Sequence, residues 1–181
     1  EVEVPEVKPG DVLIKVAYVG ICATDLEIYD GSLGYYRDGH AHYPIVPGHE
    51  YSGQVTVVGG KVSHLEEGDL VVVETVQGCG VCDNCHSGNR VGCEFRVEVG
   101  VFGRSGAYAD YLVVPGEFVH KLLPSTDLKS ATLCEPLSVV IKGVRRLGAA
   151  VENPRRIAVV GAGTIGHLTA RYLARLGHDV T

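Results

Sequence analysis

The chain has 181 residues, of which 45% are apolar and 21% are charged, and its formal net charge is −6. This composition excludes disordered and collagen-like chains, and an acidic chain without a lysine and arginine cluster is unlike a nucleic-acid binder. The longest run without Asp, Glu, Lys or Arg, residues 157–170, is shorter than the ~20 residues that a membrane span needs. We therefore expect a protein that binds neither nucleic acids nor membranes.

Residues 1 to about 124 show the pattern of a β-rich domain. Short runs rich in Val, Leu and Ile are bounded by Gly or Pro, and such runs predict strands. The four clearest runs are residues 11–18, 53–58, 70–75 and 108–115. Spaced strands with Gly-rich turns and no long helical pattern indicate an antiparallel barrel or sandwich.

From Asp127 onwards the apolar spacing changes. Apolar residues between 133 and 144 recur at intervals of three and four, which predicts a helix that ends near Leu147 and Gly148. Asn153-Pro154 marks a boundary, after which we expect a strand at 156–160, a glycine-rich turn at 161–166 and a helix at 167–176. The sequence thus predicts one domain over residues 1–150 and the beginning of another over residues 151–181.

Both ends of the chain resemble cut ends. The chain begins at Glu1 rather than at Met, and it stops at Thr181 within a predicted strand, residues 179–181. We therefore expect a fragment. No charged and then apolar signal segment opens the chain, and this favours a cytoplasmic protein.

Four of the six cysteines lie in one short segment. Cys79, Cys82, Cys85 and Cys93 follow the pattern C-x2-C-x2-C-x7-C. Two-residue spacers let the thiolates of a tight loop converge on a tetrahedral metal ion, and four thiolates leave no open position, as in structural zinc sites. Disulfides in a secreted protein, an iron–sulfur cluster and a zinc ribbon that binds nucleic acid are alternatives. The spacing, the mixed flanking charges and the lack of a signal segment favour structural zinc.

A second possible metal site combines Cys22 with His49 and Glu50. Taken singly, a cysteine is most often a small buried apolar residue, and a histidine a satisfied polar one. The pairing indicates more, because His49 follows a turn at Pro47 and Asp25 is available to fix the imidazole tautomer. Three protein ligands and one open position are the arrangement of catalytic zinc.

A third ligand could come from Cys134 or from Glu135. Adjacent residues of a helix point about 100° apart, so both cannot face one metal ion well. The alternative interpretation makes Glu135 a carboxylate near a helix N-terminus and Cys134 a core residue.

Two further groups have alternative interpretations. His40 and His42 flank Ala41, where a solvated loop is a simpler interpretation than a substrate or metal role. Tyr29, Tyr35 and Tyr36 could line a substrate pocket or pack within a loop.

The ordered motifs resemble the zinc-dependent medium-chain dehydrogenase/reductase family, which includes alcohol, sorbitol, glucose and threonine dehydrogenases. The matching segments are G-I-C-x-T-D at 20–25, P-G-H-E at 47–50, E-G-D-L-V from Glu67, the four-cysteine segment, G-x-Y-A-D-Y at 106–111, E-P-L-S at 135–138 and G-A-G-T-I-G at 161–166. Together they cover nearly the whole chain.

The resemblance implies a mostly β, GroES-like domain over residues 1–150 that carries a catalytic zinc. The start of an α/β Rossmann domain, which binds NAD or NADP, would follow over residues 151–181. By position, Cys22 and His49 match catalytic zinc ligands, and the remaining ligands are drawn from Glu50 and Glu135, as in polyol dehydrogenases. The four cysteines match the structural zinc ligands, so two zinc ions per chain are implied.

Two neighbours of Cys22 also match the family. Thr24 matches the hydroxyl that hands on the substrate proton, and Asp25 matches the carboxylate that supports the zinc-binding histidine. Many relatives carry a histidine that extends the proton relay where this chain has Glu27, a carboxylate that could pass a proton to water. Relatives are also roughly twice as long as this chain.

Gly161, Gly163 and Gly166 form a G-x-G-x-x-G motif between a predicted strand and a predicted helix. In this context the glycines permit a tight turn and a close approach to a dinucleotide pyrophosphate. With Thr164 and Ile165 they are the predicted cofactor-binding residues. The residue that selects NAD or NADP lies about 20 positions further on.

The implied function is reversible NAD(P)-linked oxidation of a secondary alcohol, polyol or sugar to the carbonyl compound by hydride transfer, in a homodimer or homotetramer. One alternative is a non-catalytic zinc-binding fragment that folds or assembles without turnover. Another is a zinc-using lyase or a reductase of activated double bonds on the same scaffold. The zinc-free reductases usually lack both metal sites, which argues against the last alternative.

Overall fold

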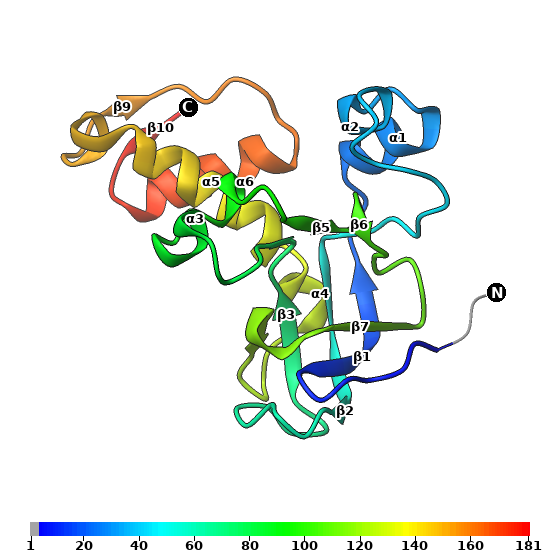
Figure 1. Ribbon diagram of the computed structural model, residues 1–181. Helices are drawn as coiled ribbons and strands as arrows, with labels where there is room; N and C mark the ends of the chain where they lie inside the picture. The colour runs from blue at the N-terminus through cyan, green and yellow to red at the C-terminus, as the bar shows by residue number, and fades with distance from the viewer. Residues whose placement is uncertain (1–3) are drawn as a thin grey trace. The chain divides into compact units, whose positions relative to one another are not determined.

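The computed structural model describes residues 4–181 and divides between Thr132 and Leu133 into two units (Figure 1). The helix predicted from the apolar spacing at 133–144 belongs to the second unit, because its apolar side chains join the core of that unit. The predicted domain boundary at residue 150 stays a prediction.

Among the described residues, five strands form the main sheet of the first unit. They are β1 (Asp11–Val19), β2 (Tyr51–Val58), β3 (Leu70–Val73), β7 (Tyr111–Pro115) and β8 (Val119–Lys121). Their order is β7-β1-β2-β3-β8, and every neighbouring pair is antiparallel, so the predicted antiparallel sheet is confirmed. Ile14 stands opposite Val55 on one side and Leu112 on the other, and all three side chains are buried in the core.

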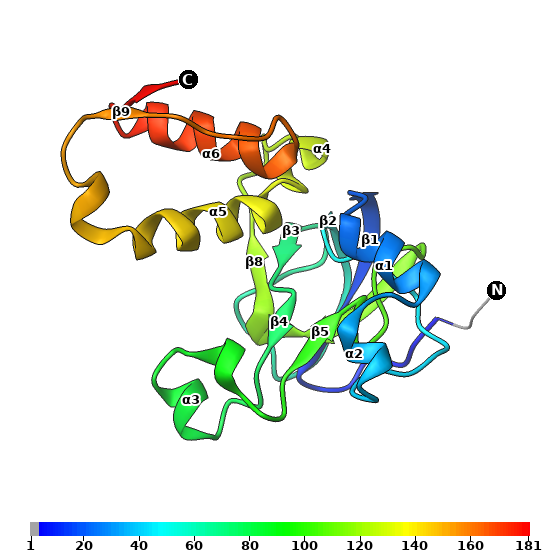
Figure 2. The ribbon, with the colours of Figure 1, turned by 90° about the horizontal axis from the view of Figure 1, so that it is seen from above.

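A smaller sheet of the same unit carries the cysteine segment. Its strands, within the described part of the chain, are β4 (Val76–Gln77), β5 (Val97–Val99) and β6 (Gly103–Arg104). The loop from β4 to β5 contains α3 (Asp83–His86) and the 3-10 turn η1 (Arg90–Gly92), and it projects from these strands (Figure 2).

Short helices complete the first unit. They are α1 (Ala23–Asp30), α2 (Gly34–Arg37), α4 (Leu128–Ala131) and the 3-10 turn η2 (Gly116–Phe118). The sequence pattern did not predict α1, because Asp25 and Ile28 are its buried residues and one apolar side chain makes no helical stripe. Thr24 is the second residue of this helix.

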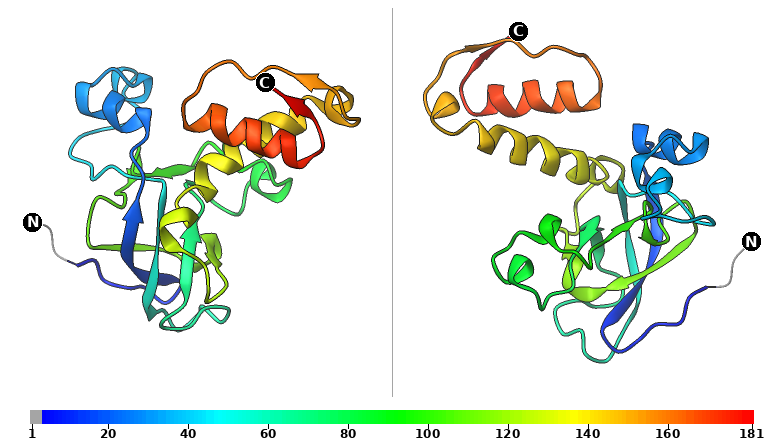
Figure 3. Two further views of the ribbon diagram at one scale, coloured as in Figure 1. Left: turned by 180° about the vertical axis from the view of Figure 1, so that it is seen from behind. Right: turned by 45° about the horizontal axis from the view of Figure 1, so that its top comes forward.

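The second unit is built from two helices and a pair of parallel strands. Its elements are α5 (Cys134–Arg146), η3 (Gly148–Val151), β9 (Arg156–Ile157), α6 (Thr164–Arg175) and β10 (Asp179–Val180). Figure 3 shows α6 between α5 and the strand pair. Strand, helix and parallel strand in this order form a βαβ unit, with Val180 opposite Ile157.

Two boundaries in the second unit differ from the sequence prediction. β9 ends at Ile157 rather than at residue 160, because its partner β10 pairs only two residues, although the Val159 N–H still donates to the Thr181 carbonyl at 2.8 Å. α6 begins at Thr164 rather than at residue 167, so Gly166 lies inside its first turn. No helix in the described part of the chain is both long and apolar enough to cross a membrane.

Candidate metal centres

Cys22 is placed by the start of α1. It directly precedes the helix, and its backbone N–H donates to Asp25 Oδ2 at 2.8 Å, while the Asp25 N–H donates to the Cys22 carbonyl at 3.1 Å. This reciprocal pair closes the first helical turn. Thr24 Oγ1 accepts from the Cys22 thiol at 3.7 Å, so the hydroxyl lies beside the predicted ligand.

His49 is placed by a loop that is fixed on two sides. Backbone N–H groups of residues 106–108 donate to the carbonyls of residues 46–48 at distances between 2.6 and 3.0 Å. The Thr75 hydroxyl donates to the His49 carbonyl at 3.2 Å. The loop leaves His49 6% exposed, two residues before strand β2 begins.

Glycines allow this loop to lie against its neighbours. Gly48 has φ +95, and Cβ atoms built on Gly100 and Gly106 would approach the Gly48 carbonyl oxygen to 2.5 and 2.3 Å. Contacts this close require glycine at both positions. The first residue of the G-x-Y-A-D-Y motif, Gly106, therefore packs against the His49 loop, and its last residue, Tyr111, begins strand β7.

The structure brings Cys22, His49 and Glu50 together. One ligand atom of each residue lies within 4.8 Å of the others. Thiolate, imidazole and carboxylate are ligands that zinc takes in proteins, so the donor set fits a zinc ion with three protein ligands. Cys22 and Glu50 are half-buried and His49 is buried, which fits an ion reached from solvent on one side.

Asp25 connects the segments that carry Cys22 and His49. Its carboxylate is 6% exposed, Oδ1 lies 3.6 Å from His49 Nδ1, and the Gly48 N–H donates to Oδ1 at 3.3 Å. Asp25 Oδ2 accepts from the Cys22 N–H and, at 2.9 Å, from the Tyr108 hydroxyl. The buried carboxylate thus lies behind both predicted ligands.

Tyr108 is a site residue that the sequence analysis missed. Burial, followed by the hydrogen bond to Asp25, raises the pKa of Tyr108, so the phenol keeps its proton and donates at neutral pH. The motif at 106–111 placed Tyr108 in the family pattern, but no local signal links it to a carboxylate 83 residues away.

The four cysteines converge as their spacing predicts. Their sulfur atoms lie within 4.8 Å of one another, no disulfide joins them in the described structure, and the Cys79 N–H donates to Cys93 Sγ at 3.4 Å. The Val81 N–H lowers the pKa of Cys79 to about 7. Although the Cys85 N–H lowers the pKa of Cys82, burial and the neighbouring thiols raise it to about 11. Four thiolates so close therefore need a cation, and this donor set fits zinc.

Glu135 and Cys134 lie in the second unit, at the beginning of α5. Glu135 is half-buried in the first helical turn, and its role as a zinc ligand stays a prediction. Cys134 is exposed, so its interpretation as a core residue is wrong. It occupies the first position of the helix, outside the stripe formed by Pro136, Val140 and Val144.

The glycine motif forms the turn from β9 into α6. Gly161 has φ +107, and a Cβ on Gly166 would stand 1.8 Å from the Gly161 carbonyl oxygen. Gly163 directly precedes the helix, which begins with Thr164 and Ile165. A helix N-terminus behind such a turn offers free N–H groups to a phosphate. A cavity of about 430 Å³ lies beside the turn.

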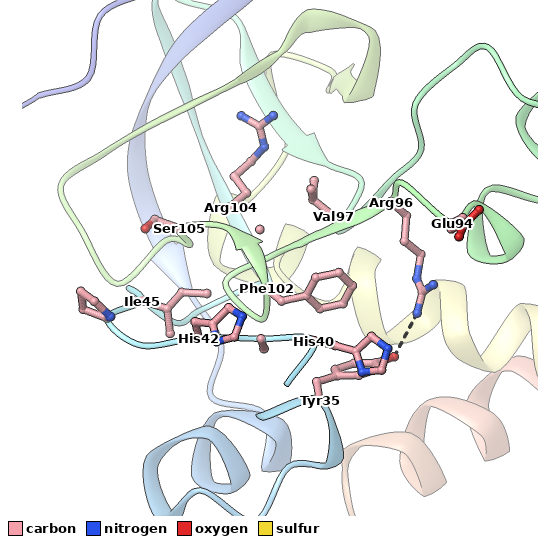
Figure 4. A pocket seen from close by; sticks show the side chains of 13 residues that line it. Tyr35, His40, His42, Ile45, Glu94, Arg96, Val97, Phe102, Arg104 and Ser105 are labelled. Carbon is pink, nitrogen blue, oxygen red and sulfur yellow. Dashed lines mark hydrogen bonds between the residues drawn. The ribbon is translucent and has the colours of Figure 1, made fainter. Parts of the chain in front are cut away.

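A cavity of about 590 Å³ lies where the segment 35–45 meets β5 and β6 (Figure 4). Tyr35, His40 and His42 line it, and Arg96 Nη2 donates to the Tyr35 hydroxyl at 3.3 Å. The Arg96 guanidinium also pairs with Glu98 at 3.1 Å. Among the described residues that line this cavity, none is a predicted zinc ligand, so it is separate from both metal centres.

Residues 8–125 match the family model described as the alcohol dehydrogenase GroES-like domain. The chain belongs to the zinc-dependent medium-chain dehydrogenase/reductase family. This assignment confirms the predicted family and the GroES-like fold of the first part of the chain. The family is one of oxidoreductases, and the cysteine cluster of this member has the ligands to hold zinc.

Relatives that align with nearly the whole chain include polyol and alcohol dehydrogenases. D-altritol 5-dehydrogenase of Agrobacterium fabrum is 34% identical over 179 residues, which are 98% of this chain and 51% of the relative. Galactitol-1-phosphate dehydrogenase of Escherichia coli is 33% identical with a TM-score of 0.85, over 99% of this chain and 50% of that structure. The cobalt- and zinc-bound alcohol dehydrogenase of Pyrobaculum aerophilum is 29% identical with a TM-score of 0.84, over 99% of this chain and 53% of that structure. The chain thus spans about half the length of these relatives.

The close packing of Gly106 predicts that Gly106→Ala lowers both the stability of the protein and metal binding at the Cys22 site. The added Cβ would stand 2.3 Å from the Gly48 carbonyl oxygen, a backbone atom that cannot move without displacing the His49 loop. We expect a loss of about 1–3 kcal/mol in the free energy of unfolding and weaker metal binding at the Cys22 site. Denaturant unfolding and zinc content would measure both. Gly143→Ala, where nothing lies within 4 Å of the added Cβ, is the control; it should lose no stability and gain up to about 1 kcal/mol, because Gly143 lies inside α5.

Proposed function

We propose that the protein is a zinc-dependent oxidoreductase that interconverts a secondary alcohol, polyol or sugar and its carbonyl compound, with NAD(P) as the hydride partner. The observation that carries this proposal is the convergence of Cys22, His49 and Glu50 beside the Thr24 hydroxyl. Relatives named for D-altritol and galactitol-1-phosphate support a polyhydroxylated substrate.

In this proposal the chain holds two zinc ions. Cys22 and His49 bind the catalytic ion, with the remaining ligands drawn from Glu50 and Glu135. Zinc held there supplies Lewis-acid polarisation of the alcohol or carbonyl oxygen. The four cysteines bind the second ion and leave it no open position, so its role is structural.

Two residues of α1 are placed to move the substrate proton. Thr24 stands next to Cys22 and takes the proton of the substrate hydroxyl through its own hydroxyl. Glu27 follows three positions later, so it lies on the same side of the helix, and it is exposed to water. We propose that Thr24 passes the proton outward and that the Glu27 carboxylate delivers it to solvent.

The βαβ unit is proposed as the beginning of a Rossmann domain. Gly161, Gly163 and Gly166, with the first N–H groups of α6 at Thr164 and Ile165, would receive the pyrophosphate of NAD or NADP. The domain division of the proposal is a catalytic domain over 1–150 and a nucleotide-binding domain from 151. A homodimeric or homotetrameric assembly and a cytoplasmic location belong to the same proposal.

The zinc content of the chain tests the proposal. After exhaustive dialysis of the 181-residue protein, elemental analysis should find about two zinc ions per chain, because both donor sets are assembled. A content near one would mean that only the four cysteines bind zinc, and the catalytic assignment would be wrong. Titration with NADH and NADPH, followed by nicotinamide fluorescence, tests the proposed cofactor site separately.

A further inference from the structure

The orientation of one buried carboxylate decides how two predicted zinc ligands are held. Asp25 Oδ2 accepts from the Cys22 N–H at 2.8 Å, and Asp25 Oδ1 lies 3.6 Å from His49 Nδ1. A rotation of the carboxylate would change both the hydrogen bond from the Cys22 N–H and the distance to His49 Nδ1. Groups behind metal ligands set the orientation of the ligands and thereby the affinity for the metal.

Tyr108 holds this carboxylate from a third segment of the chain. Its hydroxyl donates to Asp25 Oδ2 at 2.9 Å and lies 3.2 Å from the Gly20 carbonyl oxygen. A phenol has a single proton, and the charged carboxylate is the stronger acceptor of the two. The hydroxyl thus supplies Asp25 Oδ2 with a second donor beside the Cys22 N–H.

The position of the Tyr108 hydroxyl is itself fixed. The Tyr108 backbone N–H donates to the Pro47 carbonyl at 3.0 Å, within the ladder that holds the His49 loop. The ring lies against Gly48, where an added Cβ would approach ring atom Cδ1 to 2.9 Å. Tyr108 therefore ties the His49 loop, through its backbone and ring, to the carboxylate next to Cys22, through its hydroxyl.

We propose that Tyr108 is a positioning residue of the zinc site, which acts through Asp25 to hold Cys22 and His49 in the geometry that binds metal. The inference rests on the proposed function, because it requires zinc at Cys22, His49 and Glu50. It adds a residue outside the ligand set, which lies shortly before strand β7 and 83 residues from Asp25 along the chain.

Tyr108→Phe tests the hydroxyl alone, because the ring and its packing on Gly48 remain. We expect the affinity of the Cys22 site for Zn²⁺ to fall about tenfold, at the lower end of the 10–100-fold range for groups that support metal ligands. Competition with a chelating dye would measure the affinity. Tyr36→Phe is the matched control, since it also removes a tyrosine hydroxyl that donates a hydrogen bond, here to the Val101 carbonyl at 2.8 Å. Its Zn²⁺ affinity should equal that of the wild type.

Cobalt substitution gives a readout that a general loss of stability would not change. The visible absorption of Co²⁺ depends on ligand type and geometry. At full occupancy, Tyr108→Phe should alter the part of the spectrum that Cys22→Ser removes, while Tyr36→Phe should leave it unchanged. An unaltered spectrum with full affinity would overturn the positioning role.

A double-mutant cycle separates action through Asp25 from a merely structural role. In an Asp25→Asn background, Tyr108→Phe should lower the Zn²⁺ affinity by less than about twofold, because the coupled partner is already changed. Equal losses in both backgrounds would overturn the inference. If the wild-type chain binds only one zinc ion, the proposed function fails; if it binds two and Tyr108→Phe keeps full affinity, only the role of Tyr108 fails.

Discussion

Under the proposed function, Cys22→Ser is expected to remove one zinc ion per chain and to lower the proposed NAD(P)-linked alcohol oxidation by roughly 10³-fold or more. A neutral hydroxyl is a far weaker zinc ligand than a thiolate, and the polarisation lost with the ion is worth several kcal/mol, each ~1.4 kcal/mol being tenfold in rate. The fold should survive, because position 22 directly precedes α1 and serine is a preferred residue there. Elemental analysis, steady-state kinetics and circular dichroism would measure the three effects.

The neighbouring substitution Ala23→Ser provides the control for this variant. Ala23 is exposed in the first turn of α1, so the added hydroxyl alters neither donor set. This control should keep two zinc ions and its turnover. The loss of a catalytic metal should lower turnover far more than threefold. If Cys22→Ser instead turns over within about threefold of the wild type, Cys22 is not a ligand of catalytic zinc.

The parts of the structure that the sequence predicted correctly depend on local patterns. The strands at 11–18, 53–58 and 70–75 correspond to β1, β2 and β3, because alternating apolar residues face one core. The four cysteines span fifteen positions of one loop, and their spacing was enough to predict that the sulfur atoms meet. The G-x-G-x-x-G motif begins after β9 and ends in the first turn of α6, so the predicted order of strand, glycine turn and helix is also found.

What the sequence did not predict depends on contacts between distant segments. The residue types suggested combining Cys22 with His49 and Glu50, and the resemblance strengthened the pairing, but nothing in either segment alone specifies that the two segments meet. Residues 108–110, predicted as part of a strand, instead lie before β7, and the N–H groups of 106–108 bond to the His49 loop. The link from Tyr108 to Asp25 also follows from this tertiary ladder rather than from a propensity of either residue.

The early start of α6 has a packing reason. Glycine costs about 1 kcal/mol relative to alanine inside a helix, so a sequence reading places Gly166 in the turn. In the structure the absent side chain at Gly166 is what lets the first turn of the helix lie against the Gly161 carbonyl. This close approach of Gly166 to the Gly161 carbonyl explains why a glycine lies inside the first turn of α6.

Cys93→Ser is expected to unfold the loop that carries the four cysteines. Cys93 is 0% exposed and its sulfur accepts the Cys79 N–H, so the variant loses both a buried ligand and a fixed contact. We expect the loss of one zinc ion, about 4 kcal/mol of stability and about 10 °C in Tm. Elemental analysis and thermal unfolding would measure these effects. New protease cleavage sites between residues 79 and 95, located by mass spectrometry, would show the unfolding directly.

The size of this effect follows from what else could hold the loop together. Its apolar side chains, Val81, Val91 and Phe95, are 78%, 49% and 71% exposed, so the loop has no apolar core that could replace a metal ion. Arg90 anchors it to Glu74 at 2.7 Å, but a half-exposed ion pair contributes at most about 1 kcal/mol. Cys22→Ser should lose the other ion and keep this loop resistant to protease. A Cys93→Ser chain that stays resistant would mean that packing, and not metal, orders the loop.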